Sequence, residues 1–166
     1  MEQTRGEVRD VLGDLYQGGI TYGEAGQFLT PEDIARLMTK LQTAGLPAHP
    51  DRMPVVCDPC CGSGRMLLAV AEEHPGWELV GQDVDLRCVR MTAINLALRN
   101  LYGYVIHGDS LAGERKLVYR TGLNGRDFVR EIAVNACPSP VQDAAATPRQ
   151  PPPNPGAPSH QLDLFP

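Results

Sequence analysis

The sequence predicts a single α/β domain with a mainly parallel sheet, preceded by a helical N-terminal extension and followed by a disordered tail. First, short apolar runs alternate with helical patterns between residues 54 and 107, as in parallel βαβ units. Second, apolar residues recur at helical spacing within about residues 1–45. Third, nine of the fifteen prolines fall in residues 138–166, which bury too little apolar surface to offset the entropy of ordering. We therefore place the folded domain at 1–137 and the tail at 138–166.

Two helices are expected before the first strand. The first covers Glu2–Gln17, and a pair of glycines follows it. The second begins at Thr30, an N-cap candidate, with Pro31 at the first helical position, and it continues until Gly45. One face of this second helix is apolar and consists of Ile34, Leu37, Met38 and Leu41.

Strands and helices then alternate. A strand at Pro54–Asp58 leads through a glycine-bearing turn into a helix, and a strand at Trp77–Asp83 leads into a helix over Leu86–Asn100. The inward residues of the latter helix are expected to be Val89, Ala93, Leu96 and Ala97. A third strand covers Gly103–His107, and two further strands are expected at Lys116–Arg120 and Phe128–Asn135. Ligands of such sheets bind beyond the carboxyl ends of the parallel strands.

The turn after the first strand has the sequence Asp-Pro-Cys-Cys-Gly-Ser-Gly, residues 58–64. Gly62 and Gly64 allow the backbone to approach a ligand closely, and the following helix offers free amide donors at its N-terminus. The loop has neither the Gly-Lys-Ser/Thr of a phosphate-binding P-loop nor the three-glycine spacing of a dinucleotide site. We therefore predict a loop for a nucleotide-like cofactor.

Two more acids follow strand ends. Asp83 ends the second strand, 21 residues after Gly62, where a doubly wound fold holds ribose hydroxyls. Asp85 is expected to cap the next helix. Asp109 follows the third strand, where a carboxylate can accept a hydrogen bond from the amine of an adenine ring. Three acids are thus expected along one edge of the sheet.

These residues resemble the gamma-type N6-adenine DNA methyltransferases, which include modification subunits of type I restriction systems. The resemblance covers about residues 18–111, and its motifs occur in the family's order. The motifs are Gly26-Gln27-Phe28-Leu29-Thr30-Pro31, the loop Asp58–Gly64, Gly81-Gln82-Asp83 with Asn95-Leu96-Ala97-Leu98, and Gly108-Asp109-Ser110-Leu111.

The resemblance implies a Rossmann-like methyltransferase fold, S-adenosylmethionine as cofactor and adenine in DNA as substrate. Thr30 and Pro31 would contact the methionine end of the cofactor, Asp83 the ribose, and Asp109 the adenine ring. The full set of cofactor residues that it implies is Thr30, Pro31, Asp58, Pro59, Gly62, Gly64, Asp83, Asp109 and Ser110.

The sequence departs from this family after Leu111. Its members carry (Asn/Asp)-Pro-Pro-(Tyr/Phe) after the next strand, where the polar group accepts from the target amine and the aromatic ring stacks on the flipped base. This sequence has no such tetrapeptide, and the nearest candidate is Asn135 in Asn-Ala-Cys-Pro-Ser-Pro. Two hypotheses therefore stand. The first is a reduced or partner-dependent adenine-specific methyltransferase. The second is an inactive cofactor-binding scaffold that acts through a partner, either the DNA polymerase sliding clamp or a separate catalytic or specificity chain.

The net charge of −5 excludes a globally basic nucleic-acid binder. Basic residues still gather in one stretch after the third strand, and a solvated basic face is an equal alternative there. If DNA binds, its contacts are expected at Arg115, Lys116, Arg120, Arg126 and Arg130.

Five cysteines, an odd number, do not form a disulfide framework, and together with the lack of a secretory signal they indicate a cytoplasmic protein. The sequence has no apolar run near 18 residues, so we expect no membrane span. Cys57, Cys60 and Cys61 could share a zinc ion, but a second ligand pair is missing and the histidines are scattered, so we expect no metal site.

The last residues resemble the short peptide with which bacterial replication and repair proteins bind the DNA polymerase sliding clamp. The matching side chains are Gln161, Leu162, Leu164 and Phe165. A flexible proline-rich tether could present them to apolar pockets of such a partner. Clamp binding and a terminus without function are even alternatives.

Overall fold

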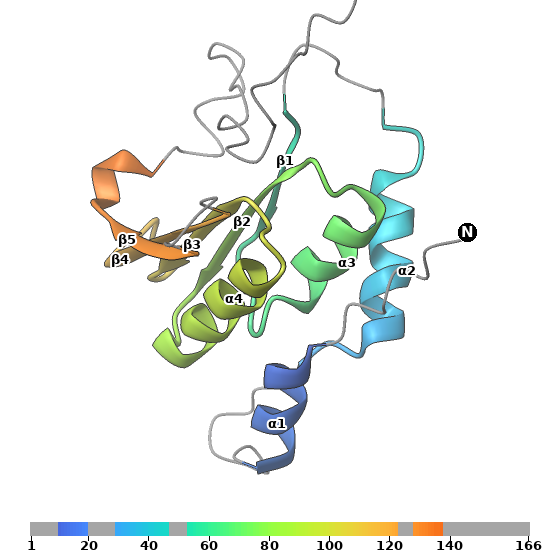
Figure 1. The fold of residues 1–166 in the computed structure, drawn as a ribbon, viewed down its shortest axis with the longest axis horizontal. Helices are drawn as coiled ribbons and strands as arrows, with labels where there is room; N and C mark the ends of the chain where they lie inside the picture. The colour runs from blue at the N-terminus through green and yellow to red at the C-terminus, as the bar shows by residue number, and fades with distance from the viewer. Residues whose placement is uncertain (1–9, 20–28, 47–52, 123–127, 138–166) are drawn as a thin grey trace, which may run out of the picture.

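The computed structural model describes residues 10–19, 29–46, 53–122 and 128–137. Within these ranges the chain forms a five-stranded sheet in the order β1-β2-β3-β4-β5 (Figure 1). The strands are β1 (Val55–Asp58), β2 (Glu78–Asp83), β3 (Gly103–His107), β4 (Leu117–Thr121) and β5 (Val129–Ile132).

The sheet is mixed. Strands β1, β2 and β3 are parallel, as expected, while β4 pairs antiparallel with β3 and β5 antiparallel with β4. A helix crosses between each pair of parallel strands, namely α3 (Arg65–Glu73) and α4 (Leu86–Leu98). Only residues 108–116 join β3 to β4, which is too short for a crossover connection, so β4 runs in the opposite direction. The expected α/β class is confirmed, and its parallel part is confined to the first three strands.

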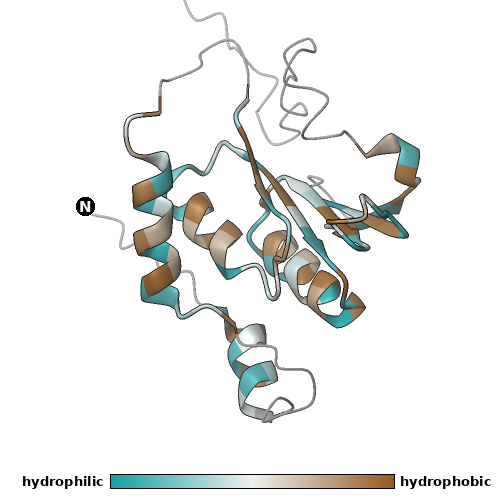
Figure 2. Cartoon of the chain, turned by 180° about the vertical axis from the view of Figure 1, so that it is seen from behind, coloured by the Kyte–Doolittle hydropathy of each residue, from teal (hydrophilic) through white to brown (hydrophobic). Residues whose placement is uncertain are grey.

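The main core lies between the sheet and helices α3 and α4, which cover one face (Figure 1). The four residues of α4 expected to face inward are all buried: Val89, Ala93, Leu96 and Ala97. Helix α2 (Glu32–Thr43) packs on the outer side of α3, where Arg36 pairs with Glu72 at 3.3 Å. The apolar face expected on α2 points outward, with brown turns on the outer side of that helix in Figure 2. Its residues are 39–67% exposed: Ile34, Leu37, Met38 and Leu41.

The two N-terminal helices begin later than expected. Helix α1 spans Val11–Gly19, and Asp10 caps it by accepting a hydrogen bond from the Gly13 amide at 2.9 Å. The prediction of a helix over Glu2–Gln17 is therefore wrong at Asp10, which precedes the helix. Residues 1–9 lie outside the described ranges. Helix α2 has Pro31, not Thr30, at its N-cap position, with no side-chain cap.

The expected last strand, Phe128–Asn135, divides into β5 and a short 3-10 helix, η1 (Val134–Ala136). A second, smaller core forms on the opposite face of the sheet from α3 and α4, where Cys137 packs with Tyr104 and Val118. The described helices include none with the length and apolar content needed to cross a membrane.

Candidate functional site

The glycine loop, residues Asp58–Gly64, joins the end of β1 to the start of α3. Gly62 and Gly64 have φ values of 55° and 90°, in the left-handed region that glycine adopts without steric cost. A Cβ at Gly64 would lie 3.1 Å from the Thr92 side chain, so a larger residue would be crowded as well as strained. The Gly64 amide donates to the Cys61 carbonyl at 2.7 Å and closes the turn. The loop therefore passes close to α4, and both backbone conformation and space require glycine at Gly64.

The three acids expected at one edge of the sheet do lie at neighbouring strand ends. Asp58, the last residue of β1, pairs with Gly81 of β2, and Asp83, the last residue of β2, pairs with His107 of β3. Asp109 follows the end of β3 by two residues. The carboxyl ends of the parallel strands thus bring these side chains to the edge where α/β proteins bind ligands.

Asp83 connects the glycine loop to the start of α4. One carboxylate oxygen accepts from the Gly62 amide and the other from the Asp85 amide, both at 2.9 Å. Asp85 caps α4 as expected, because its side chain accepts from the Arg87 amide at 2.8 Å. Each oxygen of Asp83 has a second lone pair, so the carboxylate can hold the loop and still accept from a ligand hydroxyl.

Asp58 is half-buried and accepts fewer hydrogen bonds than Asp83 does. Its Oδ1 accepts from the Cys60 amide at 3.1 Å, and Pro59 between them is exposed. Burial raises the pKa of the Asp58 carboxyl above its usual value, the Cys60 hydrogen bond lowers it, and the nearby Asp83 charge raises it. The fold therefore places a partly desolvated carboxylate directly before the glycine loop.

Asp109 shapes the loop after β3. Its Oδ1 accepts from the Leu111 amide at 2.8 Å and from the Ala112 amide at 3.2 Å. Among the described residues its Oδ2 has no hydrogen-bond donor, and Ser110 beside it is half-buried. One acceptor oxygen of Asp109 is therefore available at the edge of the sheet.

The segment before α2 reaches the glycine loop. Leu29 is 8% exposed, and its Cδ2 would lie 3.0 Å from a Cβ at Gly62. The Thr30 carbonyl accepts from Arg65 Nη1 at 3.3 Å, and Pro31 follows at the helix N-cap. Leu29, Thr30 and Pro31 thus adjoin the loop, whereas residues 26–28 of the same motif lie outside the described ranges.

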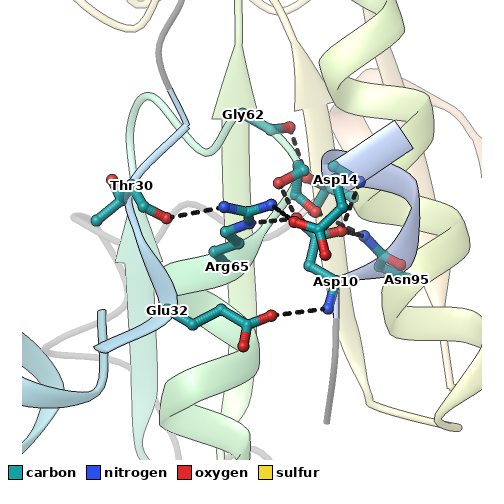
Figure 3. Close-up of polar contacts among 10 residues, drawn as sticks. Asp10, Asp14, Thr30, Glu32, Gly62, Arg65 and Asn95 are labelled. Carbon is teal, nitrogen blue, oxygen red and sulfur yellow. Dashed lines mark hydrogen bonds and ion pairs between the residues drawn. The ribbon is translucent and has the colours of Figure 1, made fainter. Parts of the chain in front are cut away.

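A buried polar network that the sequence analysis did not identify lies against the same loop (Figure 3). The Asp10 side chain is 1% exposed and accepts four hydrogen bonds. The donors to Oδ1 are the Gly13 amide at 2.9 Å and Asn95 Nδ2 at 2.7 Å. The donors to Oδ2 are Arg65 Nε at 2.8 Å and the Ser63 hydroxyl.

One signal in the sequence could have revealed this network. Arg65 occupies the first position of α3, where a cation opposes the helix dipole, so an acidic partner is needed nearby. Asp10 supplies it from a distant part of the chain, and Asp14 adds a second ion pair to the same guanidinium.

The basic residues expected to contact DNA do not form one patch in the described part of the chain. Arg115 and Lys116 precede β4, next to the carboxyl end of β3, where the Lys116 amide donates to the His107 carbonyl at 2.8 Å. Arg120 and Arg130 are cross-strand neighbours in β4 and β5, near the other end of β3. Arg126 lies outside the described residues.

Asn135, the nearest match to a catalytic asparagine, is exposed in η1 after β5. Asn135 follows β5, the edge strand on the opposite side of the sheet from β1, and in Figure 1 the short orange helix lies away from the turn between β1 and α3. The fold does not bring it to that loop, and its catalytic role stays a prediction. The peptide with Gln161, Leu162, Leu164 and Phe165 lies outside the described residues.

The cysteines differ in exposure. Cys57 and Cys60 are exposed, while Cys61, Cys88 and Cys137 are buried. Burial raises the pKa of the Cys61 thiol and raises that of Cys88 to about 12, so both stay protonated at neutral pH. Cys61 packs behind the loop, where its Sγ would lie 3.0 Å from a Cβ at Gly81. In the described ranges no three His, Cys, Asp or Glu side chains are grouped to hold a metal ion.

Comparisons with known proteins identify relatives of this chain. The chain is 29% identical over 133 residues to the type I restriction enzyme MjaVIII methylase subunit of Methanocaldococcus jannaschii, covering 74% of this chain and 21% of that protein. It is 33% identical over 111 residues to the type II methyltransferase M.MamI of Microbacterium ammoniaphilum, covering 55% of this chain and 31% of that protein.

The match extends over most of the domain. The chain is also 29% identical over 116 residues to the type I restriction enzyme MjaIX methylase subunit of M. jannaschii, covering 62% of this chain and 20% of that protein. The chain therefore spans between a fifth and a third of the length of these curated relatives. The sequence model of the N-6 DNA methylase family matches residues 7–127. This chain belongs to the N-6 DNA methylase family.

Proposed function

We propose that this domain binds S-adenosylmethionine at the carboxyl ends of β1, β2 and β3 and serves an adenine-N6 DNA methyltransferase. The family consists of S-adenosylmethionine-dependent, adenine-specific DNA methyltransferases, which supports the choice of cofactor. The observation that carries the proposal is the glycine loop held by Asp83 between two further strand-end carboxylates, Asp58 and Asp109.

The residues at this edge suit the parts of that cofactor. Gly62 and Gly64 give the loop the left-handed turn that brings its backbone to this edge, and the start of α3 lies behind them. Asp83 keeps free lone pairs for ribose hydroxyls, and Asp109 keeps one oxygen for an amine. Thr30 and Pro31 border the loop and would contact the methionine end. Pro59 and Ser110 complete the proposed set. When bound, the cofactor supplies a methyl group activated by a sulfonium.

Methyl transfer to DNA also needs groups that bind the target adenine, and the described residues do not include the family's tetrapeptide for this role. The sequence has no (Asn/Asp)-Pro-Pro-(Tyr/Phe) tetrapeptide, and Asn135 lies far from the glycine loop. Two of the similar proteins are named methylase subunits, and the chain spans only part of their length. We therefore propose that groups outside the described residues, on this protein or on a partner chain, complete the catalytic site and recognise the DNA sequence. Clamp binding through Gln161–Phe165 is not part of this proposal.

Calorimetric titration with S-adenosylmethionine tests the cofactor site. The wild-type protein should show saturable heat, and Asp83→Ala should weaken binding by about 1–3 kcal/mol, because the ligand and the Gly62 amide both lose their acceptor. Asp33→Asn, on the exposed first turn of α2, is the control and should bind as wild type does. A wild-type titration without saturation would refute the proposal.

A transfer assay separates the enzyme from the scaffold. Tritiated methyl groups from the cofactor are offered to unmethylated DNA, with the protein alone and with a cell extract of its source as a supply of partner chains. Label in DNA that disappears with Asp58→Ala supports a methyltransferase. Cofactor binding without label in either arm would support the inactive scaffold.

A further inference from the structure

We propose that Asp10 is a positioning residue for the glycine loop, and that docking of α1 and binding of the cofactor stabilise each other. The inference rests on the proposed function, because it needs a ligand at the loop. Asp10 itself lies outside the strand-end site, and no motif described above includes it.

The middle residue of the Gly-Ser-Gly turn is held at two atoms. The Ser63 hydroxyl donates to Asp10 Oδ2, and the Ser63 carbonyl accepts from Asn95 Nδ2 at 2.9 Å. The same Asn95 amide nitrogen donates to Asp10 Oδ1 at 2.7 Å (Figure 3). Asp10 therefore fixes both the side chain of Ser63 and the amide that orients its carbonyl. The flanking glycines have positive φ, so this turn depends on such contacts for a single conformation.

Helix α1 approaches the loop so closely that only glycine fits at one position. A Cβ at Gly13 would lie 2.0 Å from Asp10 Oδ2 and 2.7 Å from Ser63 Oγ. Gly18, in the same helix, has nothing within 4 Å of its Cβ position. The tight contact is therefore confined to the turn of α1 that faces the loop.

Arg65 extends the contact to a second segment of the proposed cofactor site. Its Nε donates to Asp10 Oδ2 at 2.8 Å, and its Nη1 donates to the Thr30 carbonyl at 3.3 Å. Because Arg65 also begins α3, one guanidinium joins α1, the segment before α2 and the end of the glycine loop. Movement of Asp10 and α1 away from the loop would remove the acceptor of both Arg65 Nε and the Ser63 hydroxyl.

Polar contacts contribute much of the attachment of α1. Two of its apolar side chains, Val11 and Leu15, are 57% and 68% exposed. Tyr16 is buried, and Arg87 Cζ lies over its ring, 5.6 Å from the ring centroid. An element with little buried apolar surface opens locally at a low free-energy cost. A ligand that requires the closed loop then favours the docked helix, and the docked helix favours the ligand by the same factor.

Substitutions at the two glycines test the coupling with a matched control. Alanine favours helix at both positions, so Gly13→Ala and Gly18→Ala both strengthen α1 itself. Only Gly13→Ala forces Asp10 away from Ser63. We expect Gly13→Ala and Asp10→Asn to weaken S-adenosylmethionine binding at least fivefold in calorimetry, with Gly18→Ala within twofold of wild type.

Hydrogen exchange, in the wild-type protein and in Asp10→Asn, provides a second and independent measurement. Saturating S-adenosylmethionine should slow amide exchange in peptides that cover 11–19 at least fivefold, because the ligand favours the docked helix. In Asp10→Asn this protection should be lost even at ligand concentrations that fill the site. A residue that only stabilised the fold would leave the protection intact.

The outcomes distinguish this inference from the proposed function. Wild-type protein that does not bind the cofactor defeats the proposed function. Wild-type protein that binds it with unchanged exchange in 11–19, or with equal affinity in Gly13→Ala and Gly18→Ala, overturns the coupling and leaves the proposed function intact.

Discussion

The buried Asp10 behind the glycine loop differs from the strand-end acids Asp58 and Asp109 in the partners that the fold gives it. Asp10 is almost fully buried and accepts four hydrogen bonds from donors on α1, the loop, α3 and α4. Asp58 and Asp109, at the strand ends, accept hydrogen bonds from the described residues on one oxygen each. A carboxylate offers about four acceptor positions. Asp10 has filled them with protein donors, while the strand-end acids keep capacity for a ligand.

This contrast separates structural from ligand-binding acids in one site. Burial of a carboxylate is costly unless hydrogen bonds and an opposite charge compensate it, and Arg65 does this for Asp10. Asp58 has no such compensation among the described residues, and burial raises the pKa of its carboxyl. We conclude that a carboxylate whose ionisation destabilises the fold is a stronger candidate for ligand contact than one whose acceptor positions are all used by protein donors.

The largest expected effect comes from breaking the Asp10 group. Arg65→Met removes the guanidinium but keeps much of the side-chain volume, and it leaves a buried carboxylate with neutral donors only. We expect the free energy of unfolding to fall by about 3–5 kcal/mol. Urea denaturation followed by circular dichroism measures it.

The control for Arg65 is another arginine on the helical layer. Arg36 pairs with Glu72, and the two side chains are 37% and 24% exposed. Arg36→Met should therefore lower the free energy of unfolding by no more than about 1 kcal/mol. Equal losses in the two variants would mean that Asp10 does not depend on its charge partner.

A smaller effect is expected from the hydrogen bond that fixes the loop to α4. Thr92 is fully buried, and its hydroxyl donates to the Gly62 carbonyl at 2.9 Å. Thr92→Val keeps the shape and removes the donor, so it should lower the free energy of unfolding by about 1–2 kcal/mol. Thr43→Val is the matched control, because the Thr43 hydroxyl donates only to the Thr39 carbonyl one turn back in α2. That control should change stability by less than about 0.5 kcal/mol. A loss in Thr43→Val as large as in Thr92→Val would remove the special role of the loop contact.

Local patterns in the sequence predicted the parallel strands, the glycine loop and the three strand-end acids. Each of these follows from neighbouring residues, such as an apolar run that ends in an acid and a glycine turn. The reversed direction of β4 was missed, although the short connection between the strands predicted at Gly103–His107 and Lys116–Arg120 leaves no room for a crossover helix.

The Asp10 network was missed for a related reason. Its donors Ser63 and Asn95 lie 53 and 85 residues away in the sequence, so no local pattern links them. The start of α1 was wrong because Asp10 faces these donors and caps the helix instead of extending it. The apolar residues of α2 form one face, as expected from their spacing, yet that face is exposed and the buried positions of the helix are Ala35 and Thr39.

The smallest expected effect concerns the strand-end group and has the opposite sign. Because burial raises the folded-state pKa of Asp58 above its unfolded value, ionisation of this carboxyl costs the fold stability at neutral pH. At pH 7, Asp58→Asn should therefore unfold at a slightly higher urea concentration than wild type. The gain in the free energy of unfolding should be less than about 1 kcal/mol, the contribution of one hydrogen bond. As the pH falls through the folded pKa, the wild-type carboxyl becomes neutral and the difference should disappear. Asp33→Asn, on the exposed start of α2, should not show this convergence. An Asp58→Asn protein less stable than wild type at pH 7 would mean that the charge supports the fold, and Asp58 would then belong with Asp10 rather than with the ligand-binding acids.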